Sequence, residues 1–116
     1  MKSKHFLVVM PAAAILLLSS LALAVDTQAH RKKNINTYIS LGWFTKVVIE
    51  EGYPQVYVTP AFLAFPHKDQ EGLVAVVYHY HFDLDPRYDQ VIVREAATGK
   101  KIGLFSKTVG GLKMER

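Results

Sequence analysis

Cysteine is absent from this 116-residue sequence. Its absence excludes a disulfide framework, a lipid anchor attached to a cysteine and a thiol nucleophile. An apolar core therefore has to hold the protein together. A chain of this length has room for one domain with a modest core.

Motifs that carry catalysis are also lacking. After the apolar N-terminal run the only serines are Ser40 and Ser106, and neither lies in a Gly-x-Ser-x-Gly motif. Glu50 and Glu51 are adjacent in a predicted strand, so their carboxylates would point to opposite faces of a sheet. The glycines form no phosphate-binding loop. We therefore expect a protein that is not an enzyme and has no cofactor.

Charge is missing from the stretch Phe6–Val25, which follows a short basic start. Small residues at Ala22 and Ala24 form an Ala-x-Ala pattern at its end, which predicts a signal peptide over residues 1–24. An apolar run of about 20 residues is also long enough to cross a bilayer, so an uncleaved membrane anchor is the alternative. We expect an exported protein, in the periplasm or outside the cell. The alternative places it on the inner membrane.

The positive charge of the chain is modest once the signal peptide is set aside. Without Lys2 and Lys4, twelve basic residues face ten acidic ones, which gives no reason to expect a nucleic-acid partner. Residues 25–37 are polar and include a basic cluster. We interpret this segment as a flexible lead-in and expect an ordered domain over residues 38–116.

Four short segments are typical of strands. Residues 43–50 and 55–59 are rich in β-branched and aromatic residues, with a turn at residues 51–54 between them. Residues 90–95 and 101–106 form a second pair around a turn with Gly99. The segment 61–65 is predicted to be extended or irregular, and the glycines at 110 and 111 to loosen the C-terminal end.

The segment from His67 to Asp85 fits two interpretations. Its acidic opening and an apolar stripe predict a helix, with Leu73, Val76, Val77, Tyr80 and Leu84 in that stripe. Strict alternation of apolar and polar residues would also suit a strand. We favour the helix, because a small sheet needs a second layer to cover one face.

These elements predict an α+β domain. We expect a small antiparallel four-stranded sheet made of two hairpins, with one helix packed on one face. Residues 56–82 and 89–114, with their VTPAFLAF and TGKKIG stretches, resemble a pattern in small exported bacterial proteins of unknown function. In that pattern a VTPAFLAF-like segment leads into a helix, and a C-terminal hairpin carries the TGKKIG turn. The resemblance implies the helix, but it implies no activity and no functional residue.

The stretch HYHFDLD sets two histidines and two carboxylates at every second position, namely His79, His81, Asp83 and Asp85. On a strand they would share a face and suit Zn²⁺ or Cu²⁺. On a helix they separate into pairs four residues apart. The residues His79, His81 and Asp83 also resemble part of the motif of metallo-β-lactamase-like hydrolases. That family has a further histidine where this sequence has Leu84, so we exclude this class of hydrolase.

Aromatic residues are numerous, with 6 tyrosines, 6 phenylalanines and 1 tryptophan. Most have to be core, but a sheet covered by one helix leaves its other face open. We expect Trp43 and Tyr57 on that open face, where they would bind a protein or peptide partner or a second copy of the chain. The leading hypothesis is a non-catalytic binding module. The alternative is a protein that binds a divalent metal through HYHFDLD.

Overall fold

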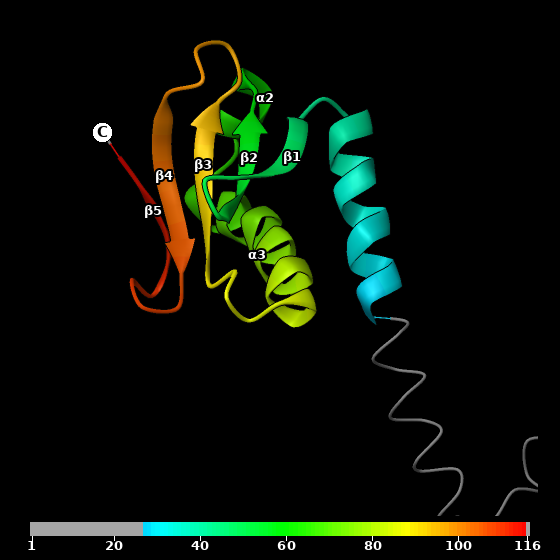
Figure 1. Cartoon of the computed structure of the whole chain (residues 1–116). Coiled ribbons are helices and arrows are strands. Elements are labelled where there is room, and N and C mark those ends of the chain that lie inside the picture. The colour runs from blue at the N-terminus through cyan, green and yellow to red at the C-terminus, as the bar shows by residue number, and fades with distance from the viewer. Residues whose placement is uncertain (1–26, 116) are drawn as a thin grey trace, which may run out of the picture. The chain divides into compact units, whose positions relative to one another are not determined.

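A computed structural model describes residues 27–115 of the chain. The predicted signal peptide or membrane anchor, residues 1–24, lies outside the described residues. No helix within residues 27–115 is both long and apolar enough to cross a membrane. The chain forms two compact units, Met1–His30 and Arg31–Arg116, and the second unit contains every described strand (Figure 1).

The second unit contains one mixed sheet of five strands, in the order β1-β2-β3-β4-β5. Strands β2 and β3 are parallel, and the other neighbouring strands are antiparallel. The predicted α+β class is confirmed. The prediction of four strands in an antiparallel sheet is wrong. The strands are β1 (Phe44–Glu50), β2 (Tyr53–Val58), β3 (Gln90–Glu95), β4 (Lys101–Ser106) and β5 (Gly111–Met114).

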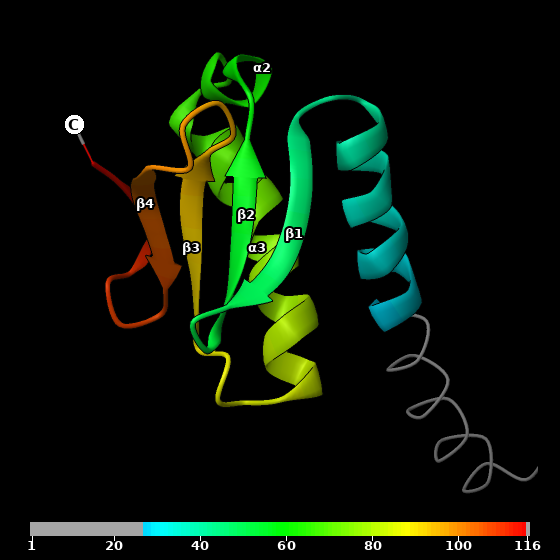
Figure 2. The same cartoon turned by 45° about the horizontal axis from the view of Figure 1, so that its top comes forward.

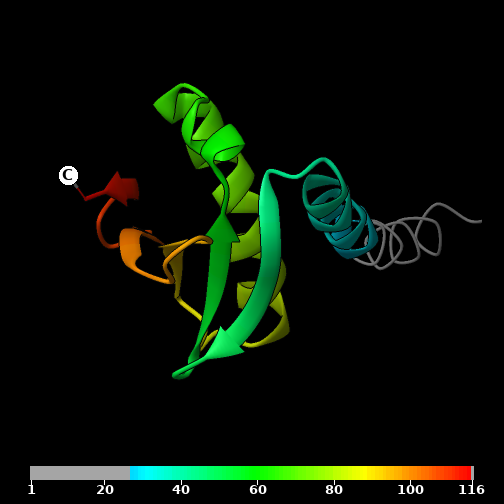
Figure 3. The same cartoon turned by 90° about the horizontal axis from the view of Figure 1, so that it is seen from above.

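The parallel pair arises from the helix between β2 and β3. The predicted helix is confirmed as α3 (His67–Leu84), which has 18 residues and is therefore about 27 Å long. A helix of this length carries the chain back along the sheet, so that β3 starts at the same end as β2 (Figure 1). Figures 2 and 3 show α3 on one face of the sheet and no helix of the described chain on the other.

Strand β5 is the element that the sequence analysis did not predict. Gly110 and Gly111 have φ angles of 82° and 121°, which turn the chain back toward β4. Leu112 then pairs with Phe105 of β4 and is buried. The backbone N–H of Leu112 also donates to the Glu71 carboxylate of α3 at 2.8 Å. The glycines therefore form a turn into an edge strand.

Two further segments are helical where the sequence predicted irregular chain. Residues 27–40 form a helix, so the prediction of a flexible lead-in over residues 25–37 is wrong for its described part. Within the second unit this helix buries Ile35 in the core. Residues 61–65 were expected to be irregular, but α2 (Pro60–Leu63) forms there, because Thr59 caps it and Pro60 suits a first turn.

The core lies between α3 and the sheet. Helix α3 buries Gln70, Val74, Val77 and Tyr78, whereas Leu84, which we expected in the buried stripe, is 61% exposed. The strands contribute alternate residues to this core, since successive side chains of a strand point to opposite faces. The fully buried strand residues of this core are Phe44, Val56, Val58, Val91 and Val93.

Candidate functional site

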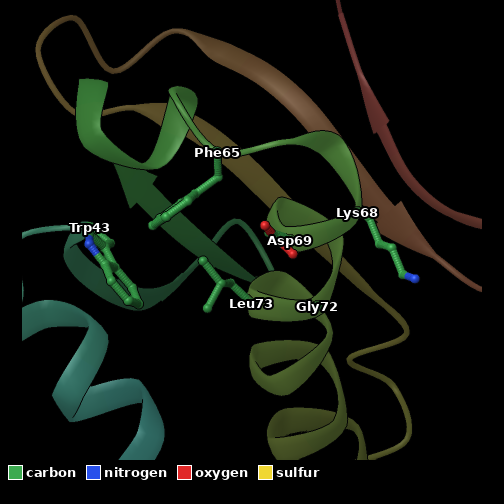
Figure 4. A pocket seen from close by; sticks show the side chains of 6 residues that line it. All are labelled: Trp43, Phe65, Lys68, Asp69, Gly72 and Leu73. Atoms are coloured by element: carbon green, nitrogen blue, oxygen red, sulfur yellow. The ribbon is translucent and has the colours of Figure 1, made fainter.

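A pocket of about 390 Å³ lies where the start of β1, the segment after α2 and the first turns of α3 meet. Its size is within the range of pockets that hold small ligands or single side chains of a partner. Figure 4 shows its side chains from close by. The lining residues are Trp43, Phe65, Lys68, Asp69, Gly72 and Leu73.

Two aromatic rings form the apolar wall of this pocket. The rings of Trp43 and Phe65 are 4.9 Å apart between centroids and nearly perpendicular, at 88°. Tyr38 stacks on Trp43 at 5.7 Å, so the indole is held between two neighbours. Edge-to-face and stacked pairs of this kind stabilise a defined ring orientation. Leu73 of α3 points toward the two rings (Figure 4).

Thr59 fixes the backbone on both sides of the pocket. Its hydroxyl lies 2.6 Å from the Gly42 carbonyl oxygen and 3.1 Å from the Trp43 carbonyl oxygen, and donates its proton toward them. The Thr59 backbone N–H also donates to the Trp43 carbonyl at 3.1 Å. At the same time the hydroxyl oxygen accepts from the backbone N–H of Phe62 in α2. One side chain therefore connects Trp43 to the segment that carries Phe65.

Gln70 supports the same segment from α3. Its side chain is 7% exposed, and its amide nitrogen donates to the carbonyls of Phe62 and Leu63 at 3.4 and 3.3 Å. These bonds join α3 to two carbonyls at the C-terminal end of α2, of which that of Phe62 also accepts from the backbone N–H of Phe65 at 3.1 Å. Gln70 and Thr59 together position Phe65 before any partner arrives.

Two charged residues stand at the rim of the pocket. Lys68 and Asp69 are both exposed, and neither side chain makes an ion pair or hydrogen bond with any residue in the range 27–115. In Figure 4 the Asp69 carboxylate points toward Phe65 and Leu73, whereas the Lys68 side chain points away from them. The charge that faces the pocket is therefore negative.

Tyr57 lies elsewhere, on the sheet face that α3 does not cover. It alternates with the core residues Val56 and Val58, so its ring points to the other side. Its hydroxyl donates to the Glu50 carboxylate at 2.7 Å, and the Lys46 ammonium lies 4.4 Å from the ring centroid. The hydrogen bond to Glu50 raises the pKa of Tyr57.

The structure therefore separates the two predicted binding residues. Tyr57 is on the open face, as expected, but Trp43 lines a pocket with residues of α3 on the covered side. Phe65 and Asp69 belong to this pocket and were not predicted as site residues. The sequence pattern around these two residues is not distinctive. Phe65 is an aromatic residue before a proline, Asp69 is an acidic residue in a first helical turn, and both arrangements are common.

The HYHFDLD stretch lies in the last turns of α3, where the carboxylates are paired with arginines. Asp83 accepts from Arg31 at 2.5 Å. Asp85 binds Arg87 through both carboxylate oxygens, with a shortest distance of 2.7 Å, and these bonds lower the pKa of Asp85. No three His, Asp or Glu side chains of the described chain come close enough to share a metal ion. The geometry therefore favours the Trp43 pocket as the candidate site.

Both histidines of this stretch have a lowered pKa. Burial lowers the pKa of His81, whose Nδ1 lies 2.8 Å from the Val77 carbonyl oxygen and donates to it. Burial also lowers the pKa of His79. The positive charges of Arg31 and Lys107 add to this effect, and Asp83 opposes it. Both rings therefore bind a proton less readily in the folded chain than in the unfolded chain.

We expect the protein to lose stability as the pH falls below about 6.5. Below that value both histidines bind protons more strongly in the unfolded chain, because their pKa is lower in the folded chain. Proton binding therefore shifts the equilibrium toward unfolding. Urea denaturation at a series of pH values would measure this loss. The variant carrying His79→Gln and His81→Gln should lose less stability over the same range. A wild-type protein that becomes more stable in mild acid would contradict this account.

Comparison with known proteins provides no guide to this site. No protein-family model matches the chain, and no significant similarity was found to curated proteins or to solved structures.

Proposed function

We propose that the protein is a non-catalytic binding module whose Trp43–Phe65 pocket receives one side chain of a protein or peptide partner. The observation that carries this proposal is a half-buried aromatic pocket whose walls are held in place by hydrogen bonds from Thr59 and Gln70. A pocket formed before binding avoids part of the entropy cost of ordering side chains in the complex.

The residues around the pocket support binding more than catalysis. Its polar side chains are one lysine and one aspartate, and Figure 4 shows them pointing in different directions. No hydroxyl or imidazole lines it that could act as a nucleophile or a general base. Aromatic anchors in a defined pocket are typical of the central contacts of protein interfaces. The predicted signal peptide would present this module outside the cytoplasm.

The single tryptophan of the chain offers a direct test. Trp43 is the only residue with an indole N–H, so its signal in a ¹⁵N–¹H spectrum reports on the pocket alone. We expect capped peptides Gly-X-Gly, in which X has a long side chain, to shift this signal in a saturable way. The peptide with glycine at X should leave it unchanged.

Two variants give this test its control. Phe65→Ala removes one wall of the pocket and should weaken peptide binding about tenfold or more. Leu84→Ala changes a residue that is 61% exposed at the other end of α3, and it should leave binding unchanged. If no peptide shifts the Trp43 signal, or if Phe65→Ala binds as well as the wild type, the pocket is not a binding site.

A further inference from the structure

We infer that this pocket selects a cationic side chain, lysine or arginine, with its apolar stem against the rings and its charge at Asp69. The inference rests on the proposed function and adds the chemical class of the bound group. Three features of the pocket carry it, namely the carboxylate, the aromatic wall and the direction of the nearest positive charge.

The first feature is the Asp69 carboxylate. It has no ion-pair partner among residues 27–115, and it lines the pocket together with Phe65 and Leu73 (Figure 4). The other acidic residues of α3 are engaged, because Glu71 accepts from the backbone of Leu112 and Asp83 accepts from Arg31. Asp69 is therefore the acceptor that α3 leaves open beside an apolar pocket.

The second feature is the aromatic wall. A cation close to the face of an aromatic ring is attracted to its π electrons, most strongly for tryptophan. Long side chains such as lysine place apolar methylene groups against apolar surface while the charged end stays near water. Trp43, Phe65 and Leu73 provide that apolar surface. At Gly72, apart from its chain neighbours and the backbone of its own helix, nothing lies within 4 Å of the place where a Cβ would be, which leaves space for an incoming stem.

The third feature separates this inference from an anionic ligand. The N-terminal end of a helix and a nearby lysine would both attract an anion. Here, however, the Lys68 side chain points away from the pocket (Figure 4). The backbone N–H groups of Asp69 and Gln70 already donate to the Pro66 carbonyl, each at 3.0 Å. The lysine side chain and these two N–H groups are therefore not directed at a ligand in the pocket.

The test compares three capped peptides, Gly-Lys-Gly, Gly-norleucine-Gly and Gly-Glu-Gly, by the Trp43 indole signal of the full chain at low salt. Norleucine has an unbranched apolar stem similar to that of lysine but no charge, so it separates shape from charge. We expect the lysine peptide to bind about fivefold to tenfold more tightly than the norleucine peptide. The glutamate peptide should bind most weakly.

Asp69→Asn keeps the shape of the side chain and removes its charge, so it should abolish the preference for lysine over norleucine. Asp89→Asn is the matched control, because it removes one exposed acidic charge from a loop that does not line the pocket, and it should keep the preference. Equal binding of lysine and norleucine by the wild type would overturn the inference and leave the proposed function standing. Tightest binding of the glutamate peptide would also overturn it. No response to any peptide would reject both.

Discussion

Replacing Phe62 by alanine is expected to lower the free energy of unfolding by about 3–5 kcal/mol, the range for truncating a fully buried aromatic side chain. Phe62 is 0% exposed, and its ring lies 5.8 Å from that of Phe44 between centroids. The variant would leave a cavity between α2 and the core. It would also loosen the helix that precedes Phe65, so the Trp43 pocket should lose its shape.

The neighbouring residue provides a matched control for this experiment. Leu63 lies in the same short helix but is 37% exposed, so Leu63→Ala should cost far less. Urea denaturation followed by circular dichroism would give both free energies, and the Trp43 emission would report on the pocket. Equal losses for the two variants would mean that α2 does not contribute to the core as described.

Replacing Gln55 by leucine is expected to cost about 1–3 kcal/mol, because it removes the two hydrogen bonds that a fully buried side chain makes to Glu50 and Arg94. Gln55 is 0% exposed, although it lies on the sheet face that α3 does not cover. Its amide nitrogen donates to the Glu50 carbonyl at 2.8 Å, and its amide oxygen accepts from the Arg94 guanidinium. Leucine has a similar volume but can form neither bond.

A second substitution at this position separates the two bonds. Gln55→Glu keeps the oxygen that accepts from Arg94 and removes the nitrogen that donates to Glu50. If the hydrogen bond to Arg94 contributes more to stability than the bond to Glu50, this variant should retain more stability than Gln55→Leu in urea denaturation. A leucine variant as stable as the wild type would show that apolar contacts on this face outweigh the polar network.

The fold was predictable from the sequence where local signals decide it. Strands β3 and β4 follow from alternating apolar residues on either side of a turn that contains Gly99, and α3 follows from its acidic opening and its length. The parallel pairing of β2 with β3 was not predictable in this way, because it depends on where α3 returns the chain. Strand β5 depends on a partner strand, since Gly111–Met114 is short and begins with glycine.

The buried face of α3 was also not predictable from the sequence alone. Apolar residues occur on several sides of this helix. Its periodicity favoured a stripe with Leu73, Val76, Val77, Tyr80 and Leu84, of which only Val77 is fully buried. The helix over residues 31–40 also packs on the core, through Ile35, and its Arg31 donates a hydrogen bond to Asp83 of α3. Periodicity alone could not show that α3 has more than one neighbour.

The candidate site could be predicted only in part. Trp43 was predicted as a binding residue, but on the open face of the sheet and not beside α3. Its approach to Phe65 depends on the α2 turn, which Thr59 caps and Gln70 holds from α3. These contacts join segments that are separate in sequence, so no local pattern reveals them.

The parallel contact between β2 and β3 also has a consequence for how fast the sheet can form. Strands β1 and β2 are neighbours in sequence, as are β3, β4 and β5, so each group can pair within a short stretch of chain. The two groups meet only along β2 and β3, whose pairing has to close a loop over residues 59–89. Closing such a loop costs chain entropy before the contacts compensate for it. We therefore expect the pairing of β2 with β3 to limit the rate of refolding, while the hairpins on either side form earlier.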